Sequence, residues 1–140
     1  MKKSMTINTT VIINLLAGII MAVAPKIWAK PCSKMMSLEN GNQMHMRCFY
    51  SRQALVILGI ILVINALVMF LVKSKIQGAA VAIITSVLSF IVVSDTSLGI
   101  GICAHMEMAC HVMASWAKLS AGLSIITGII LIILNLNKEK

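Results

Sequence analysis

Sulfur-containing side chains gather in two segments of the chain that share one pattern. Met44-His45-Met46-Arg47-Cys48 and Met106-Glu107-Met108-Ala109-Cys110 both read Met-x-Met-x-Cys. Thioether, thiolate and imidazole groups are soft or borderline ligands that suit Cu(I). In an extended segment alternate side chains lie on one face, so each segment would present two thioethers and one cysteine together. With His45, His105 and His111 close by, an outer-surface Cu(I) site is one hypothesis for this pattern.

The four cysteines offer a second chemistry, the disulfide bond. Cys32 and Cys48 belong to one polar stretch of the chain, and Cys103 and Cys110 belong to another. An even number of cysteines in loops is typical of disulfides in an oxidising compartment. The spacing favours the pairs Cys32–Cys48 and Cys103–Cys110, and pairing between the two stretches is the open alternative. The absence of Cys-x-x-Cys argues against a thiol oxidoreductase.

The two chemistries compete because a disulfide sulfur is a poor metal ligand. Methionine is also a flexible apolar residue that is common at adaptable protein contacts. We therefore expect disulfides and no bound cofactor. The Cu(I) site is the alternative, and its ligands would be Met44, Met46, Met106, Met108, His45, His105 and His111.

The amino-acid composition indicates whether the chain folds in water or in a lipid bilayer. Of its 140 residues 59% are hydrophobic and only 11% are charged, well below the share of an ordinary soluble domain. The net charge of +8 does not indicate nucleic-acid binding, because the basic residues are scattered and only 4% of residues are aromatic. A lipid bilayer is the partner that this composition favours.

Charged residues divide the chain into four apolar stretches, each about as long as a helix that crosses a bilayer. Backbone amides in lipid must be satisfied within the segment, so these stretches are expected to be helices. The predicted helices cover residues 5–25, 53–72, 77–94 and 118–137, with extracytoplasmic loops over 26–52 and 95–117. An even number of spans places both termini on one side. The terminal lysines and the tight Lys73-Ser74-Lys75 turn favour the cytoplasm for that side.

The two halves of the chain resemble each other. Beyond the shared Met-x-Met-x-Cys pattern, the register pairs Asn14 with Thr85, and Asn65 with Thr127, as intramembrane polar residues at matching positions. We expect these four residues to form hydrogen bonds within the helix packing. The predicted fold is an all-α integral membrane protein. It is a four-helix bundle of two tandem helix-loop-helix repeats with a disulfide-braced extracytoplasmic cap.

Both cysteine segments also carry a family resemblance. The chain resembles an uncharacterised bacterial family of small four-span membrane proteins, domain of unknown function 4418, over essentially its whole length. The residues that carry the likeness are Cys32, Met46-Arg47-Cys48-Phe49-Tyr50-Ser51, Ala54 and Gly59 in the first half, and Gly101-Ile102-Cys103 and Met108-Ala109-Cys110-His111 in the second. Where the family pattern has His-Trp, this chain has Phe49-Tyr50, which argues for a structural role of this segment.

The resemblance implies a bacterial plasma-membrane protein and carries no established activity. Its relatives often neighbour export-type ABC transporters, which implies a membrane permease as partner. The sequence has no paired carboxylates, no Ser-His-Asp set and no phosphate-binding glycine loop, so we expect no enzyme. The apolar stretches hold no ionisable residue, which argues against an ion relay or a lone exporter. We expect a non-enzymatic accessory subunit of a larger membrane complex, with the Cu(I)-binding protein as the alternative.

Overall fold

Four long helices make up most of the described chain. The computed structural model describes residues 2–30, 35–37, 40–41, 43–45, 47–71, 75–94, 97, 99–100 and 109–137. The helices are α1 (Lys2–Ile27), α2 (Arg47–Leu71), α3 (Lys75–Val93) and α4 (Ala109–Leu136). Each of them is long and apolar enough to cross a membrane. The prediction of a multi-pass membrane protein is thereby confirmed.

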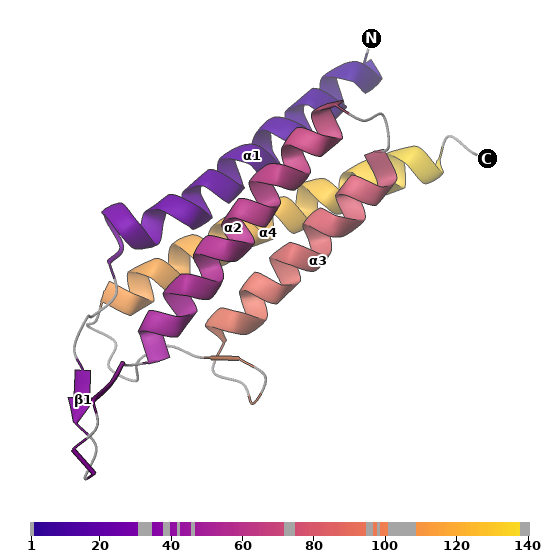
Figure 1. Cartoon of the computed structure of the whole chain (residues 1–140). Coiled ribbons are helices and arrows are strands. Elements are labelled where there is room, and N and C mark those ends of the chain that lie inside the picture. The colour runs from indigo at the N-terminus through magenta and orange to yellow at the C-terminus, as the bar shows by residue number, and fades with distance from the viewer. Residues whose placement is uncertain are drawn as a thin grey trace.

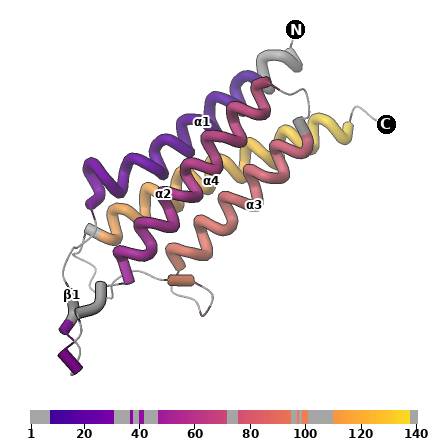
Figure 2. Tube along the Cα trace, viewed as in Figure 1, coloured from indigo at the N-terminus to yellow at the C-terminus, as the bar shows by residue number. Residues whose placement is uncertain are grey.

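The helices form a four-cornered bundle (Figure 1). α1 packs against α2 and α4, and α3 also packs against α2 and α4, so α2 and α4 occupy opposite corners. The start of α1 and the end of α4 lie at one end of the bundle, together with the end of α2 and the start of α3 (Figure 1 and Figure 2). The end of α1 and the starts of α2 and α4 lie at the other end, which we name the loop end.

The outward faces of the helices are apolar. Ile57 of α2, Ile84 of α3 and Ile126 of α4 are each more than half exposed near the middle of their helices. Such residues would face water in a soluble protein, whereas in a bilayer they contact acyl chains at no cost. The basic side chains that the structure describes on the helices lie toward the loop end of the bundle, where they can reach the headgroups.

Two helices begin earlier than the sequence predicts. α2 begins at Arg47 rather than at residue 53, and α4 begins at Ala109 rather than at residue 118. Arg52 and Lys118 mark the limit of the apolar stretch, but a helix that satisfies its own backbone can continue past the hydrocarbon into the interface. The consequence is that Cys48 and Cys110 belong to the first turns of helices and not to loops.

A small β-hairpin precedes α2 at the loop end. β1 (Met35–Ser37) pairs antiparallel with β2 (Gln43–His45), in a register that places Met36 opposite Met44. The turn contains Gly41 with a φ of 73°, a left-handed conformation that glycine adopts without steric cost. The all-α prediction therefore holds for the four helices but misses this hairpin, which projects beyond the bundle (Figure 1).

Glycines allow α1 and α2 to approach at backbone distance. A Cβ atom added at Gly59 would lie 2.7 Å from the backbone nitrogen of Ala22 and 2.9 Å from the carbonyl oxygen of Gly18. A Cβ atom at Gly18 would lie 2.9 Å from a methyl carbon of Val63. Small residues at such a crossing are the usual basis of helix association in lipid. At Gly122 of α4, by contrast, an added Cβ would meet nothing within 4 Å.

These distances predict that Gly59→Ala destabilises the bundle and that Gly122→Ala does not. The added methyl group at residue 59 must push two backbones apart, which costs about 1–3 kcal/mol. Thermal unfolding in detergent, followed by circular dichroism, measures the difference between the two variants. Equal melting temperatures would contradict the close approach of α1 and α2.

Candidate functional site

The cysteines of the two Met-x-Met-x-Cys segments meet at the loop end of the bundle. Cys48 in the first turn of α2 and Cys110 in the first turn of α4 are both fully buried. The Sγ of Cys110 donates to the Sγ of Cys48 over 2.8 Å. This distance exceeds the roughly 2.05 Å of a disulfide bond, so the two sulfurs are in contact but are not bonded to each other.

The oxidation states of these two cysteines differ. Cys48 takes part in a disulfide bond, whereas Cys110 is a thiol that does not. The predicted Cys103–Cys110 disulfide is therefore wrong. The reason is the early start of α4, which draws Cys110 out of its loop and turns it toward the opposite corner of the bundle. Cys32 and Cys103 lie outside the described residues, so the predicted Cys32–Cys48 pairing stays a prediction.

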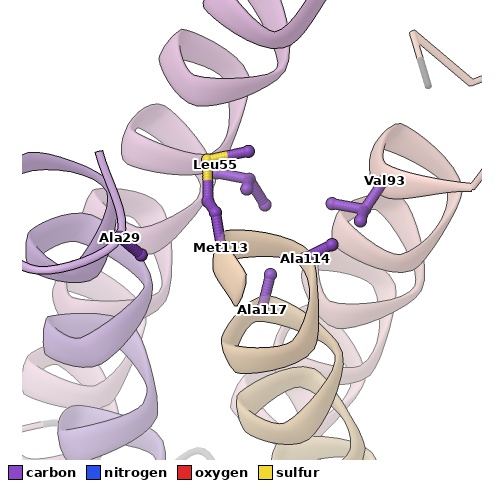
Figure 3. Packing of buried hydrophobic residues seen from close by; sticks show 6 residues of the cluster. All are labelled: Ala29, Leu55, Val93, Met113, Ala114 and Ala117. Carbon is purple, nitrogen blue, oxygen red and sulfur yellow. The ribbon is translucent and has the colours of Figure 1, made fainter. Parts of the chain in front are cut away.

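An apolar layer lies directly inward of the two sulfurs. It contains Ala29, Leu55, Val93, Met113, Ala114 and Ala117, and each of them is at least 96% buried. Met113 of α4 reaches Leu55 of α2 across the bundle (Figure 3). The sequence placed Met113 in a loop, but it is a core residue because it follows Cys110 by one helical turn. The layer separates the sulfur contact from the middle of the membrane.

The other predicted metal ligands are spread over the loop end. His111 is half-buried in the first turn of α4, and Met44 and His45 belong to β2. The hairpin register also places Met35 opposite His45. Met46, His105, Met106 and Met108 lie outside the described residues. Within the described part of the chain, no three His, Cys, Asp or Glu residues form a group that could hold a metal ion.

Two of the four predicted intramembrane polar residues bridge helices. The side-chain amide of Asn14 donates to the Thr10 carbonyl at 3.0 Å, and its oxygen accepts a hydrogen bond from the Ser124 hydroxyl of α4. The amide of Asn65 donates to the Gly78 carbonyl of α3 at 2.9 Å. These bonds link α1 to α4 and α2 to α3, at two of the four contacts around the bundle.

The two threonines bond within their own helices instead. Thr85 donates to the Val81 carbonyl at 2.8 Å, and Thr127 donates to the Leu123 carbonyl at 2.9 Å. A hydroxyl on a helix can always reach the carbonyl one turn before it, so a threonine alone does not indicate an interhelical bond. The sequence missed Ser124, because serine in an apolar helix gives no signal of which neighbour it faces.

The burial pattern of α2 recurs in α4. Each buried residue of α2 corresponds to a buried residue of α4 that is 62 positions later in the chain. The pairs are Cys48 and Cys110, Ser51 and Met113, Leu55 and Ala117, Gly59 and Ala121, Leu62 and Ser124, Ala66 and Gly128, and Met69 and Leu131. For α1 and α3 the best match is an offset of 68 positions, which aligns Asn14 with Ala82 rather than with Thr85.

The model of a protein family described as domain of unknown function (DUF4418) matches residues 14–136. The chain belongs to this family. The match to DUF4418 includes all of α2, α3 and α4, the C-terminal half of α1 and both cysteines of the sulfur contact. No curated protein and no solved structure matches the chain. The expected family membership is thereby confirmed, and it brings no activity with it.

The hydrogen bonds predict that Asn14→Leu destabilises this DUF4418 protein and that Thr127→Val does not. The first change removes the bond between α1 and α4 and leaves the buried Ser124 hydroxyl without that acceptor, whereas the second removes a bond within one helix. Interhelical bonds in membranes average about 0.6 kcal/mol and reach about 1.7 kcal/mol. Unfolding in detergent with a denaturing surfactant measures the free energy of unfolding of both variants. A loss of stability in Thr127→Val as large as that in Asn14→Leu would contradict the assignment of the interhelical bond to Asn14 and of the bond within one helix to Thr127.

Proposed function

We propose that this protein is a non-enzymatic accessory subunit that docks onto a larger membrane protein through the loop end of its bundle. The observation that carries the proposal is the β-hairpin of residues 35–45. A two-stranded hairpin alone is at best marginally stable in water and needs a further strand or a helix to pack on. Its strands have only three residues each, and its main contact with the bundle runs from β2 to α2.

The sequence of the hairpin suits a contact surface. Its strands carry Met35, Met36 and Met44, and methionine adapts to irregular partner surfaces because its side chain is unbranched and polarisable. No Asp or Glu lies on either strand. A short, methionine-rich hairpin beyond the bundle is therefore more stable when a partner covers it.

The interior of the bundle supports a structural role over transport. Small side chains such as Ala66, Ala82 and Ala121 are fully buried between the helices. At the loop end the layer around Leu55 and Met113 fills the middle of the bundle. A passage for ions or solutes would need polar groups lining a water-filled path, whereas the buried Asn14 and Ser124 are hydrogen-bonded to each other.

The partner that we propose is a permease, such as that of an export-type ABC transporter, in the plasma membrane of a bacterium. We further propose cytoplasmic termini, which would place the hairpin outside the cell. The recurrence of the α2 burial pattern in α4 supports an origin by tandem duplication, with α1 and α2 as one repeat and α3 and α4 as the other. A pseudo-twofold axis along the membrane normal would then pass between Cys48 and Cys110.

Substitutions at Gly41 test the docking function. Gly41→Val cannot adopt the left-handed turn without strain, whereas Gly41→Asn can. We expect Gly41→Val to lose co-purification with the partner from source membranes, and Gly41→Asn to keep it. Both variants should keep the melting temperature of the bundle, because residue 41 meets nothing of it. Undiminished co-purification of Gly41→Val would contradict docking through the hairpin.

A second function, Cu(I) binding, is favoured by two observations at the loop end. The register of the hairpin places Met36 opposite Met44, and cross-strand neighbours have Cβ atoms within about 5.5 Å of each other. The contact of Cys48 with Cys110 brings the ends of the two Met-x-Met-x-Cys segments together. Thioethers and thiols from both halves would then be available to one soft cation after reduction.

Titration of the reduced protein with Cu(I) against a competing chelator tests this second function. We expect the double variant Met36→Leu with Met44→Leu to bind at least one Cu(I) fewer than the wild type. Met21→Leu, which changes a buried methionine of α1, is the matched control and should bind as the wild type does. An unchanged stoichiometry in the double variant would exclude the hairpin methionines as ligands.

A further inference from the structure

A groove between α1 and α2 opens to the outside near the loop end. Its lining residues are Lys26, Phe49, Arg52, Gln53, Val56 and Ile57. Lys26 lies in the last turn of α1, and Arg52 lies in the second turn of α2. The polar residues therefore lie toward the end of the bundle, and the apolar wall of Val56 and Ile57 lies one turn further into the membrane.

The charge of the groove has one sign. Lys26 and Arg52 contribute two cations, and no Asp or Glu occurs anywhere in the described part of the chain. The whole chain carries a formal net charge of +8. Two cations that line one groove with no carboxylate among its lining residues favour an anionic ligand there.

The depth of the groove matches the headgroup region of a bilayer. Trp28, directly after α1, is 50% exposed, and Tyr50 of α2 is 46% exposed. Trp28 also meets Trp116 of α4 edge to face, with ring centroids 6.0 Å apart. Exposed Trp and Tyr residues at the ends of spanning helices mark the interface between hydrocarbon and water. The cations of the groove lie within a turn or two of these rings along the chain.

We propose that this groove binds one anionic phospholipid. The phosphate lies between the ammonium group of Lys26 and the guanidinium group of Arg52, whose planar donors match phosphate oxygens. An acyl chain follows Val56 and Ile57 toward the middle of the membrane. The amide of Gln53, which also lines the groove, donates to the glycerol ester region. This binding site does not depend on the proposed docking function, since the hairpin contributes no lining residue.

The apolar wall is the reason to choose a lipid over a free phosphate ion. A small anion would need only the two cations and would gain nothing from Phe49, Val56 and Ile57. A phospholipid uses both halves of the groove. The acyl contacts hold the lipid in the membrane plane, and the two cations select a negatively charged headgroup. The attraction between the cations and the headgroup falls as the ionic strength rises.

The test uses native mass spectrometry of the full chain, released from nanodiscs that contain equal amounts of phosphatidylglycerol and phosphatidylcholine. We expect the wild type to retain one phosphatidylglycerol. The double variant Lys26→Gln with Arg52→Gln should retain it roughly thirtyfold less, because it loses both cations. The matched control, Lys30→Gln with Lys118→Gln, removes two exposed cations near the same end of the bundle that do not line the groove. It should retain the lipid as the wild type does.

A charge-preserving variant, Lys26→Arg with Arg52→Lys, separates lipid binding from folding and should also retain phosphatidylglycerol. Three results would overturn the proposal. The first is equal retention in the groove variant and the control variant. The second is equal retention of phosphatidylglycerol and phosphatidylcholine by the wild type. The third is complete displacement of the lipid by millimolar inorganic phosphate, which would identify the ligand as a free anion.

Discussion

The contact between the sulfurs of Cys48 and Cys110 constrains the whole loop end of the bundle. α2 and α4 stand at opposite corners, and the two sulfurs bring their first turns into contact across the interior of the bundle. α1 and α3 then fit on either side of this contact, and the layer around Leu55 and Met113 fills the space below it. One pair of buried side chains thus connects two opposite corners of the bundle at that end.

Two features of the loop end depend on the same helix start. The hairpin is held beyond the bundle by the short connection from β2 to α2, so the position of Cys48 also determines where the hairpin projects. Arg52 follows Cys48 by about one turn and faces the groove that it shares with Lys26 of α1. The proposed docking surface and the proposed lipid site are therefore both positioned by the first turns of α2.

The sequence predicts the number and order of the helices well, because four charge-free stretches of bilayer length leave few alternatives. It predicts the helix starts poorly. Arg52 and Lys118 look like the ends of spans, but the backbone of a helix does not end where the hydrocarbon ends. This error assigned Cys110 to a loop and gave it a disulfide partner there. The sequence does not predict the hairpin, because strands of three residues are too short to show an alternation of apolar and polar residues.

Side-chain partners across helices were harder still to predict. Asn14 and Asn65 are recognisable in the sequence as polar residues within the membrane, but nothing in the sequence identifies Ser124 or the Gly78 carbonyl as their partners. Which residues face each other depends on the rotation of each helix about its axis, and serine, alanine and glycine fit many rotations. The groove at Lys26 and Arg52 depends on the same rotations of α1 and α2.

The most direct test of the sulfur contact is oxidation of a variant that keeps only Cys48 and Cys110, with Cys32→Ser and Cys103→Ser. Mild oxidation with diamide, denaturation and alkylation are followed by the intact mass. If the two sulfurs meet as the structure places them, the oxidised variant forms one disulfide between α2 and α4 and takes up no alkylating reagent. Two alkylated cysteines after oxidation of the folded variant would contradict the contact on which the packing of the loop end depends.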